Sequence, residues 1–259
     1  MKQGAVNDVL VSYTPANFPH YDHQDAIVVV IDILRATSAI CTAFMNGVEK
    51  IIPVKTVEEA EAYRNKGYLA AAERNGEKLD GFDMGNSPFD FDAATVQGKE
   101  VVLTTTNGTQ AIAAAQNAYQ VVIGSFLNIS ALCNYLVSQD RNVILLCAGW
   151  KNKYNMEDSI YAGAIVGELL KSDRFSTTCD SAIAASHIFG IANYDLYRFL
   201  DYSSHRIRLR QLKLEKDIRY CLQRDITDII PVLKGDALVR MDESNSSMNH
   251  EITSARARH

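Results

Sequence analysis

Short apolar runs alternate along this chain with stretches in which apolar side chains recur every three or four positions. The runs predict seven β-strands, at residues 6–13, 26–33, 51–54, 69–72, 100–104, 121–125 and 142–147. The stretches between them predict five helices, at residues 36–44, 56–67, 108–117, 130–138 and 158–171. Such alternation of strand and helix is typical of an α/β fold with a largely parallel sheet.

The strongest strand signal is AIVVVIDI at residues 26–33, where the apolar residues are continuous rather than alternating. A strand buried on both faces has this composition, so we expect it at the centre of the sheet. Thr56 followed by Glu59 has the spacing of a capping box and predicts the start of a helix, which we expect to end near Gly67.

The pattern changes after Ser172. Residues 180–200 and 207–223 predict longer helices, and residues 229–239 predict a closing hairpin. We therefore expect residues 1–240 to form two α/β lobes, with a boundary near residues 126–140. Residues 241–259 are polar and predict a mobile tail.

Composition excludes several classes of protein. Hydrophobic residues make up 47% and charged residues 22% of the 259 residues, which is ordinary for a globular chain. A net charge of −5 argues against nucleic acid or an anionic membrane as partner. No apolar run approaches the roughly 18 residues of a membrane span. The five cysteines contain no CxxC pair, which predicts reduced thiols and a cytoplasmic protein.

The most specific local pattern is TTTNGT at residues 104–109, between a predicted strand and a predicted helix. Free N–H groups at a helix start attract anions, and a glycine lets an anion approach the backbone closely. We expect this turn to bind phosphate through Thr105, Thr106, Asn107, Gly108 and Thr109. The alternative is an ordinary helix cap with spare threonines.

Acidic residues follow two of the predicted strands. Asp32 ends the central strand, at the edge of the sheet where α/β proteins bind ligands, and Arg35 begins the next helix. Glu157 and Asp158 open a later helix. Because hard carboxylate oxygens suit Mg²⁺, we predict that Asp32, Glu157 and Asp158 hold this ion. The alternatives are an Asp32–Arg35 ion pair and plain helix-dipole stabilisation by the two later acids.

Further candidates lie in and before the loop at residues 75–98, which is too long to be a simple connection. Arg74 would add a second guanidinium, and Asn86 and Ser87 could donate to an anion, although Asn-Ser-Pro is also a common turn composition. His205 is either an acid-base group or a first-turn residue of a helix capped by Ser203 or Ser204. Cys147 is more typical of a buried thiol than of a nucleophile.

Taken together, IDILRATSAI, ERNG, GFDMGNSP, TTTNGTQA, GSFLN, CAG, EDS, DYSSH and IIPVL resemble the 2-phosphosulfolactate phosphatase family. The motifs occur in the family's order across residues 8–240. The resemblance implies a Mg²⁺-dependent phosphatase of coenzyme M biosynthesis, which converts 2-phosphosulfolactate to 3-sulfolactate and phosphate. It also implies two α/β lobes with the active site in the cleft between them. Asn128, in GSFLN, joins the predicted phosphate-binding residues.

The predicted partner is thus a small anionic phosphorylated substrate, and a homo-oligomer is compatible with the sequence. One departure from the family's pattern is Lys213, where a glycine is expected. Two other interpretations stay open. A haloacid dehalogenase-like phosphatase would use Asp32 as nucleophile, but it needs a second acid where Leu34 stands. A non-catalytic anion-binding protein would gain nothing from the acids beside its ligand.

Overall fold

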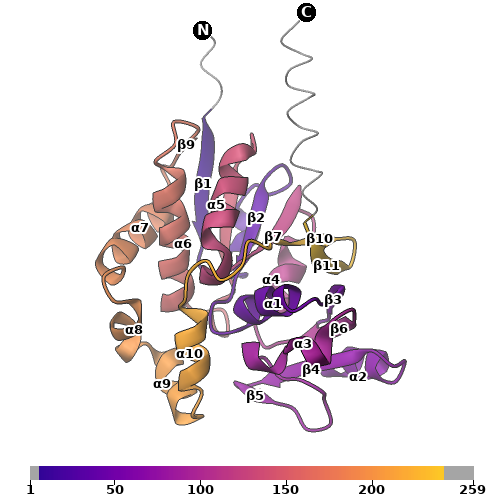
Figure 1. Ribbon diagram of the computed structural model, residues 1–259. Coiled ribbons are helices and arrows are strands. Elements are labelled where there is room, and N and C mark those ends of the chain that lie inside the picture. Colours follow the sequence, from indigo (N-terminus) through magenta and orange to yellow (C-terminus); the bar gives the residue numbers. More distant parts are fainter. Residues whose placement is uncertain (1–5, 242–259) are drawn as a thin grey trace, which may run out of the picture.

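The computed structural model describes residues 6–241, which form one mixed sheet of eleven strands flanked by helices (Figure 1). The strands are β1 (Asn7–Ser12), β2 (Ile27–Ile31), β3 (Lys50–Pro53), β4 (Leu69–Arg74), β5 (Glu77–Lys78), β6 (Glu100–Thr104), β7 (Gln120–Gly124), β8 (Val143–Cys147), β9 (Phe175–Ser176), β10 (Pro231–Lys234) and β11 (Ala237–Arg240). Across the sheet they lie in the order β5-β4-β6-β3-β11-β10-β7-β2-β8-β1-β9. The predicted α/β class is confirmed.

The described residues also form ten α-helices and four short 3₁₀ turns. The helices are α1 (Ala36–Met45), α2 (Val57–Arg64), α3 (Ala93–Val96), α4 (Gly108–Ala115), α5 (Ile129–Ser138), α6 (Met156–Leu169), α7 (Asp180–Ala192), α8 (Leu196–Phe199), α9 (Ser204–Gln211) and α10 (Glu215–Cys221). Within residues 6–241, no helix is both long and apolar enough to cross a membrane.

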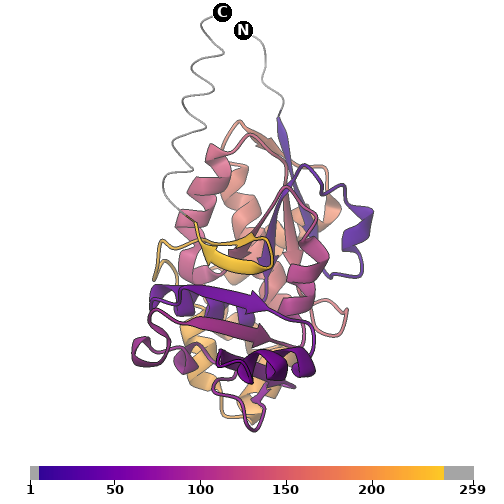
Figure 2. The ribbon, with the colours of Figure 1, turned by 90° about the vertical axis from the view of Figure 1, so that its right-hand side faces the viewer.

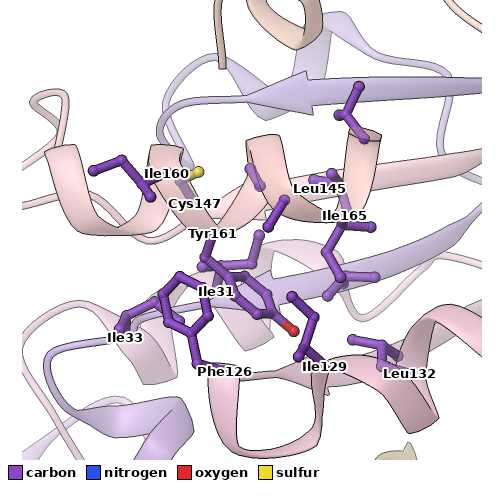
Figure 3. Packing of buried hydrophobic residues seen from close by; sticks show 14 of the residues in the cluster. Ile31, Ile33, Phe126, Ile129, Leu132, Leu145, Cys147, Ile160, Tyr161 and Ile165 are labelled. Carbon is purple, nitrogen blue, oxygen red and sulfur yellow. The ribbon is translucent and has the colours of Figure 1, made fainter. Parts of the chain in front are cut away.

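The central position predicted for the strand IVVVI is confirmed. All five residues of β2 are buried, and the strand pairs in parallel with β7 on one side and β8 on the other. Alternate side chains serve the two faces: Ile27, Val29 and Ile31 join one apolar cluster, while Val28 and Val30 join the other. On the first face, Figure 3 shows Tyr161 of α6 beside Phe126, with their ring centroids 5.0 Å apart.

The C-terminal hairpin joins two groups of parallel strands. β10 and β11 pair with each other in antiparallel fashion, as expected for residues 229–239. Each then makes a single register contact with a parallel group, Val232 with Val122 of β7 and Leu238 with Ile51 of β3. Figure 2 shows this hairpin, in yellow, lying between the two groups. The end of the chain therefore completes the middle of the sheet.

The lobe boundary near residues 126–140 stays a prediction, and strand pairing gives one continuous sheet around it. Residues 126–140 contain α5, which links β7 to β8, and both of these strands flank β2. The second parallel group, β3, β4 and β6, instead comes from residues 50–104, inserted between α1 and β7. Residues 242–259 of the predicted tail lie outside the described residues.

The helix predicted over residues 207–223 is broken into α9 and α10 at Lys213. Lys213 has a φ of 61°, and its N–H donates to the Arg210 carbonyl while the Leu214 N–H donates to the Leu209 carbonyl. This pair of bonds is the Schellman ending of a helix, which favours glycine at the left-handed position. The glycine that the family resemblance leads us to expect at this position thus has a conformational reason.

We predict that Lys213→Gly raises the free energy of unfolding by about 1 kcal/mol, because a left-handed backbone is costly for a residue with a Cβ. Lys213→Ala removes the same charged chain but keeps the Cβ, so it is the matched control and should give no gain. Urea unfolding of the parent and both variants measures the effect. Equal stability of the glycine and alanine variants would contradict the prediction.

Candidate active site

A cavity lies where the turns after β2, β4 and β6 meet the side of α9. Its lining residues are Asp32, Leu34, Arg35, Glu73, Gly76, Asn86, Thr106, Asn107, His205, Arg208 and Leu209. Five of the residues singled out from the sequence as site residues are therefore brought together: Asp32, Arg35, Asn86, Thr106 and Asn107. The same cavity contains Glu73 and Arg208, which sequence reasoning did not select.

Asp32 follows β2 and is only 6% exposed. A Cβ on Gly108 would lie 3.0 Å from Asp32 Oδ2 and 2.7 Å from the Ala36 Cβ, so the start of α4 packs directly on this carboxyl group. The pKa of Asp32 is raised to about 6, chiefly by burial and also by the carboxylates of Glu73 and Glu157, against the lowering effect of His205. Gly108 is thus needed for close packing beside Asp32.

Two threonines of the TTTNGT turn stabilise the start of α4 by hydrogen bonds. The Thr109 N–H donates to Thr105 Oγ1 at 3.2 Å, and Thr109 Oγ1 donates to the Thr105 carbonyl at 3.1 Å. Both residues are buried. For Thr105 and Thr109 the structure therefore favours the capping alternative over direct contact with an anion.

The Glu73 carboxylate binds to the turn that we expected to bind phosphate. Its Oε2 accepts from the Thr106 N–H at 3.2 Å, and Thr106 Oγ1 donates to the same carboxylate. Its Oε1 also accepts from the Gly76 N–H. Neighbouring Arg74 points to the other face of β4, where it donates to the Thr104 hydroxyl at 3.0 Å. Neighbouring residues of a strand point to opposite faces, and this alternation in ERNG could have indicated Glu73 instead of Arg74 as the cavity residue.

Asp158 joins the ends of two adjacent strands. Its Oδ1 accepts from the Ile33 N–H at 2.9 Å, after β2, and its Oδ2 accepts from the Gly149 N–H at 3.2 Å, after β8. Burial raises the pKa of Asp158 well above its ordinary value, and the carboxylates of Asp32 and Glu157 add to this. Both oxygens of this predicted metal ligand are therefore already engaged by the backbone.

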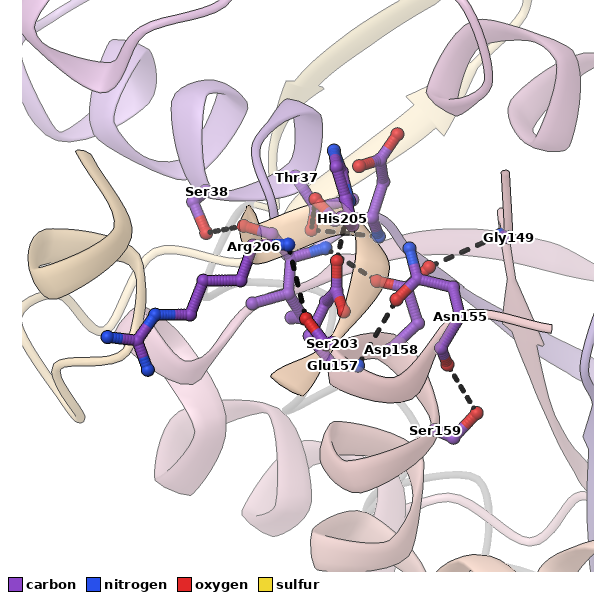
Figure 4. A network of polar contacts seen from close by, with 12 residues as sticks. Thr37, Ser38, Gly149, Asn155, Glu157, Asp158, Ser159, Ser203, His205 and Arg206 are labelled. Atoms are coloured by element: carbon purple, nitrogen blue, oxygen red, sulfur yellow. Dashed lines mark hydrogen bonds and ion pairs between the residues drawn. The ribbon is translucent and has the colours of Figure 1, made fainter. Parts of the chain in front are cut away.

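Glu157 and His205 form a buried pair (Figure 4). Glu157 lies in the first turn of α6, is fully buried, and has its Oε1 2.5 Å from His205 Nδ1. Its Oε2 has no hydrogen-bond partner among the described residues. Both interpretations of His205 hold in part, because Ser203 caps α9 through the Arg206 N–H while His205, in the first turn, lines the cavity.

Arg35 does not pair with Asp32. Its Nη1 lies 2.6 Å from Asp217 Oδ2 on α10, and its Nη2 donates to the Gly76 carbonyl at 2.7 Å. The side chains of both partners are less than one-tenth exposed. The alternative of an Asp32–Arg35 ion pair is thus wrong. The Arg35 guanidinium instead binds Asp217, which lies 182 residues further along the chain.

Two further residues of the predicted set, Ser87 and Asn128, do not line the cavity. Ser87 Oγ accepts from the Phe89 N–H and caps the 3₁₀ turn Pro88–Asp90. Asn128 is fully buried, and its amide bonds the Ser125 N–H and the carbonyls of Ile123 and Ile229. Asn86, by contrast, lines the cavity, and its Oδ1 is buried without a partner among the described residues.

Comparison with known proteins identifies the family of this chain. The family model described as 2-phosphosulpholactate phosphatase matches residues 12–236. A protein of Thermotoga petrophila named "Probable 2-phosphosulfolactate phosphatase" is 42% identical over 205 residues, covering 79% of this chain and 88% of that protein. A protein of the same name from Caldanaerobacter subterraneus subsp. tengcongensis is 38% identical over 226 residues, covering 86% of this chain and 93% of its own.

The chain belongs to the 2-phosphosulfolactate phosphatase family. This membership confirms the resemblance read from the motifs, and with it the interpretation of the chain as a phosphoric monoester hydrolase. The haloacid dehalogenase-like alternative needs a second acid two residues after Asp32. That position holds the buried, apolar Leu34, so this alternative loses its support.

The cysteines take no part in the site of this family member. All five are free thiols, and Cys147 is completely buried after β8. Burial raises the pKa of the Cys147 thiol well above its ordinary value, so the nucleophilic thiolate is disfavoured. The interpretation of Cys147 as a structural thiol fits this environment.

We predict that Asp32→Asn stabilises the folded protein in metal-free buffer, by roughly 3 kcal/mol at pH 8 and far less at pH 4. The pKa of this carboxyl rises from 3.8 in the unfolded chain to about 6, so the folded state binds more protons between these values. Stability therefore falls as pH rises through this window, and the penalty is complete above about pH 6. The amide carries no such charge.

Thermal unfolding of both proteins at the two pH values measures this difference. The variant should melt several degrees above the parent at pH 8, since about 1 kcal/mol corresponds to roughly 2–4 °C in a protein of this size. Asp173→Asn, which removes an exposed carboxylate before β9, is the control and should show no such gain. A variant advantage that is the same at both pH values would contradict the prediction.

Proposed function

We propose that this protein is a Mg²⁺-dependent phosphatase that hydrolyses a small anionic phosphate monoester, with 2-phosphosulfolactate as the leading substrate. The names of its relatives support the substrate. The observation that carries the metal requirement is the charge of the cavity. Carboxyl groups predominate there, although the substrate is itself a polyanion.

The acids outnumber the bases among the described residues of the cavity and their direct partners. Arg35 is paired with Asp217, and His205 with Glu157. Asp32 and Glu73 then remain, against the single guanidinium of Arg208. Because like charges repel strongly at low dielectric, a phosphate dianion needs additional positive charge to enter. A divalent cation would supply it.

The donors present fit a Mg²⁺ ion that arrives with its substrate. Asp32 and Glu157 offer hard oxygens, and the buried Glu157 Oε2 lacks a partner. Within residues 6–241, no cluster of three or more His, Cys, Asp or Glu side chains has the geometry of a metal site. Mg²⁺ is commonly held by one or two carboxylates together with phosphate oxygens and water. We therefore assign Asp32 and Glu157 as its ligands, with Asp158 holding the two strand ends beneath them.

When bound, Mg²⁺ would neutralise charge on the transferring phosphoryl group and activate water. The chain's own residues would orient the ester. Arg35 is held at the cavity wall by Asp217. The Asn107 side-chain oxygen Oδ1 accepts from the Lys151 N–H at 3.2 Å, which leaves the side-chain NH₂ group for a phosphate oxygen. His205, which contacts Glu157 through Nδ1, would give a proton to the leaving oxygen.

We predict that purified protein releases phosphate from 2-phosphosulfolactate with Mg²⁺ present, and that EDTA lowers the rate at least about 100-fold. Phosphate release from 2-phosphosulfolactate, 2-phospholactate and para-nitrophenyl phosphate gives the substrate preference. Mg²⁺ together with inorganic phosphate should also raise the melting temperature of the parent and of Asp173→Asn, but not of Asp32→Asn.

Two outcomes would refute parts of this proposal separately. Hydrolysis that survives EDTA would remove the metal from the mechanism while leaving the phosphatase in place. Binding of phosphate without turnover of any ester would favour the non-catalytic anion-binding alternative.

A further inference from the structure

We propose that Arg208, stacked on Trp150, recognises a second anionic group of the substrate, a carboxylate or sulfonate on its carbon skeleton. Arg208 would thereby select acidic phosphate monoesters over esters of neutral alcohols. The inference rests on the proposed function, because it concerns the substrate of the same cavity. It deepens that proposal by naming the residue that sets the substrate class.

Arg208 is the cavity guanidinium that lacks an anion. It lines the cavity and is partly buried, yet within residues 6–241 it forms no salt bridge, and its Nε is buried without a hydrogen-bond partner. Arg35, the other guanidinium in the lining, is taken by Asp217 at 2.6 Å and by the Gly76 carbonyl. An unpaired charge in such a position is costly, which indicates a partner supplied from outside the chain.

Trp150 holds this guanidinium in a defined orientation. The Arg208 Cζ lies 4.6 Å from the centroid of the Trp150 ring, in the loop between β8 and α6. The adjacent Lys151 N–H donates to Asn107 Oδ1, which ties the same loop to the TTTNGT turn. A guanidinium stacked on a ring keeps its planar edge for a bidentate anion, and carboxylate and sulfonate both fit that edge.

Arg208 and Asp32 line the cavity from different elements, α9 and the turn after β2. Burial lowers the pKa of Arg208, and the carboxylates of Glu73, Glu157 and Asp32 oppose this effect. The proposed metal ligand Asp32 assigns the phosphoryl group to the turn after β2. Arg208 then remains for a group attached further along the substrate.

The test compares substrates with and without the second anion. For 2-phosphosulfolactate, Arg208→Gln should raise KM about 10–100-fold with a much smaller change in kcat, as expected for one charge-assisted contact. For para-nitrophenyl phosphate the loss in kcat/KM should be at least tenfold smaller. Arg208→Lys, which keeps the charge but not the planar edge, should recover part of the loss.

Arg210→Gln is the matched control. Arg210 lies on the same helix, half exposed, and pairs with Asp201 instead of facing the cavity. It should leave kinetics with both substrates as in the parent. Titration calorimetry of 3-sulfolactate and of inorganic phosphate gives a readout that does not depend on turnover: Arg208→Gln should weaken 3-sulfolactate about 10–100-fold and phosphate less than about threefold.

Equal losses with both substrates would overturn the inference, because Arg208 would then act on the phosphoryl group. No loss with either substrate would overturn it as well. If the parent hydrolyses no ester, the proposed function fails, and the calorimetric comparison of 3-sulfolactate with phosphate alone decides the role of Arg208.

Discussion

The structure depends on burying several carboxyl groups at one edge of an apolar sheet. Asp32, Glu73, Glu157 and Asp158 are each less than one-tenth exposed. A buried carboxylate is costly unless donors surround it, so the turns around it are constrained by its hydrogen bonds. Asp158 accepts from the N–H groups of Ile33 and Gly149, which follow β2 and β8. Glu73 accepts from the N–H groups of Gly76 and Thr106, and Glu157 pairs with His205. These bonds shape the cavity.

The C-terminal helices complete the site that the parallel strands begin. His205 and Arg208, three residues apart on α9, face the cavity together with Leu209, and Asp217 of α10 reaches Arg35. Lys213 provides the left-handed step that lets the chain turn from one helix to the other. The β10–β11 hairpin then returns to the sheet between the two parallel groups. The C-terminal part of the described chain thus both lines the cavity and closes the fold.

The raised pKa of Asp32 means that its charged form lowers the stability of the folded protein. A neutral side chain there would be easier to bury, because Glu73 and Glu157 already repel a charge at this position. In the proposed function, binding of a cation to this carboxylate, whose pKa is about 6, would relieve the repulsion. Sites of this kind concentrate destabilising charge where ligands later compensate for it.

The sequence by itself determined the strands and helices of the α/β class, the central strand, the closing hairpin, the capping of α2 and the family. These follow from periodicity and from short-range hydrogen bonds, which neighbouring residues control. Asp32, Arg35, Asn86, Thr106 and Asn107 were also found, because strand ends and turns of parallel sheets carry ligands.

Only the tertiary structure decided which polar groups meet. Asp217 rather than Asp32 pairs with Arg35, and Glu73 rather than Arg74 faces the cavity. Among residues 6–241, Arg208 forms no salt bridge. Asn128 and Thr105, polar residues in promising motifs, are used to satisfy backbone groups. Side chains far apart in the sequence pair according to strand order and helix packing. Local sequence patterns do not predict either of these.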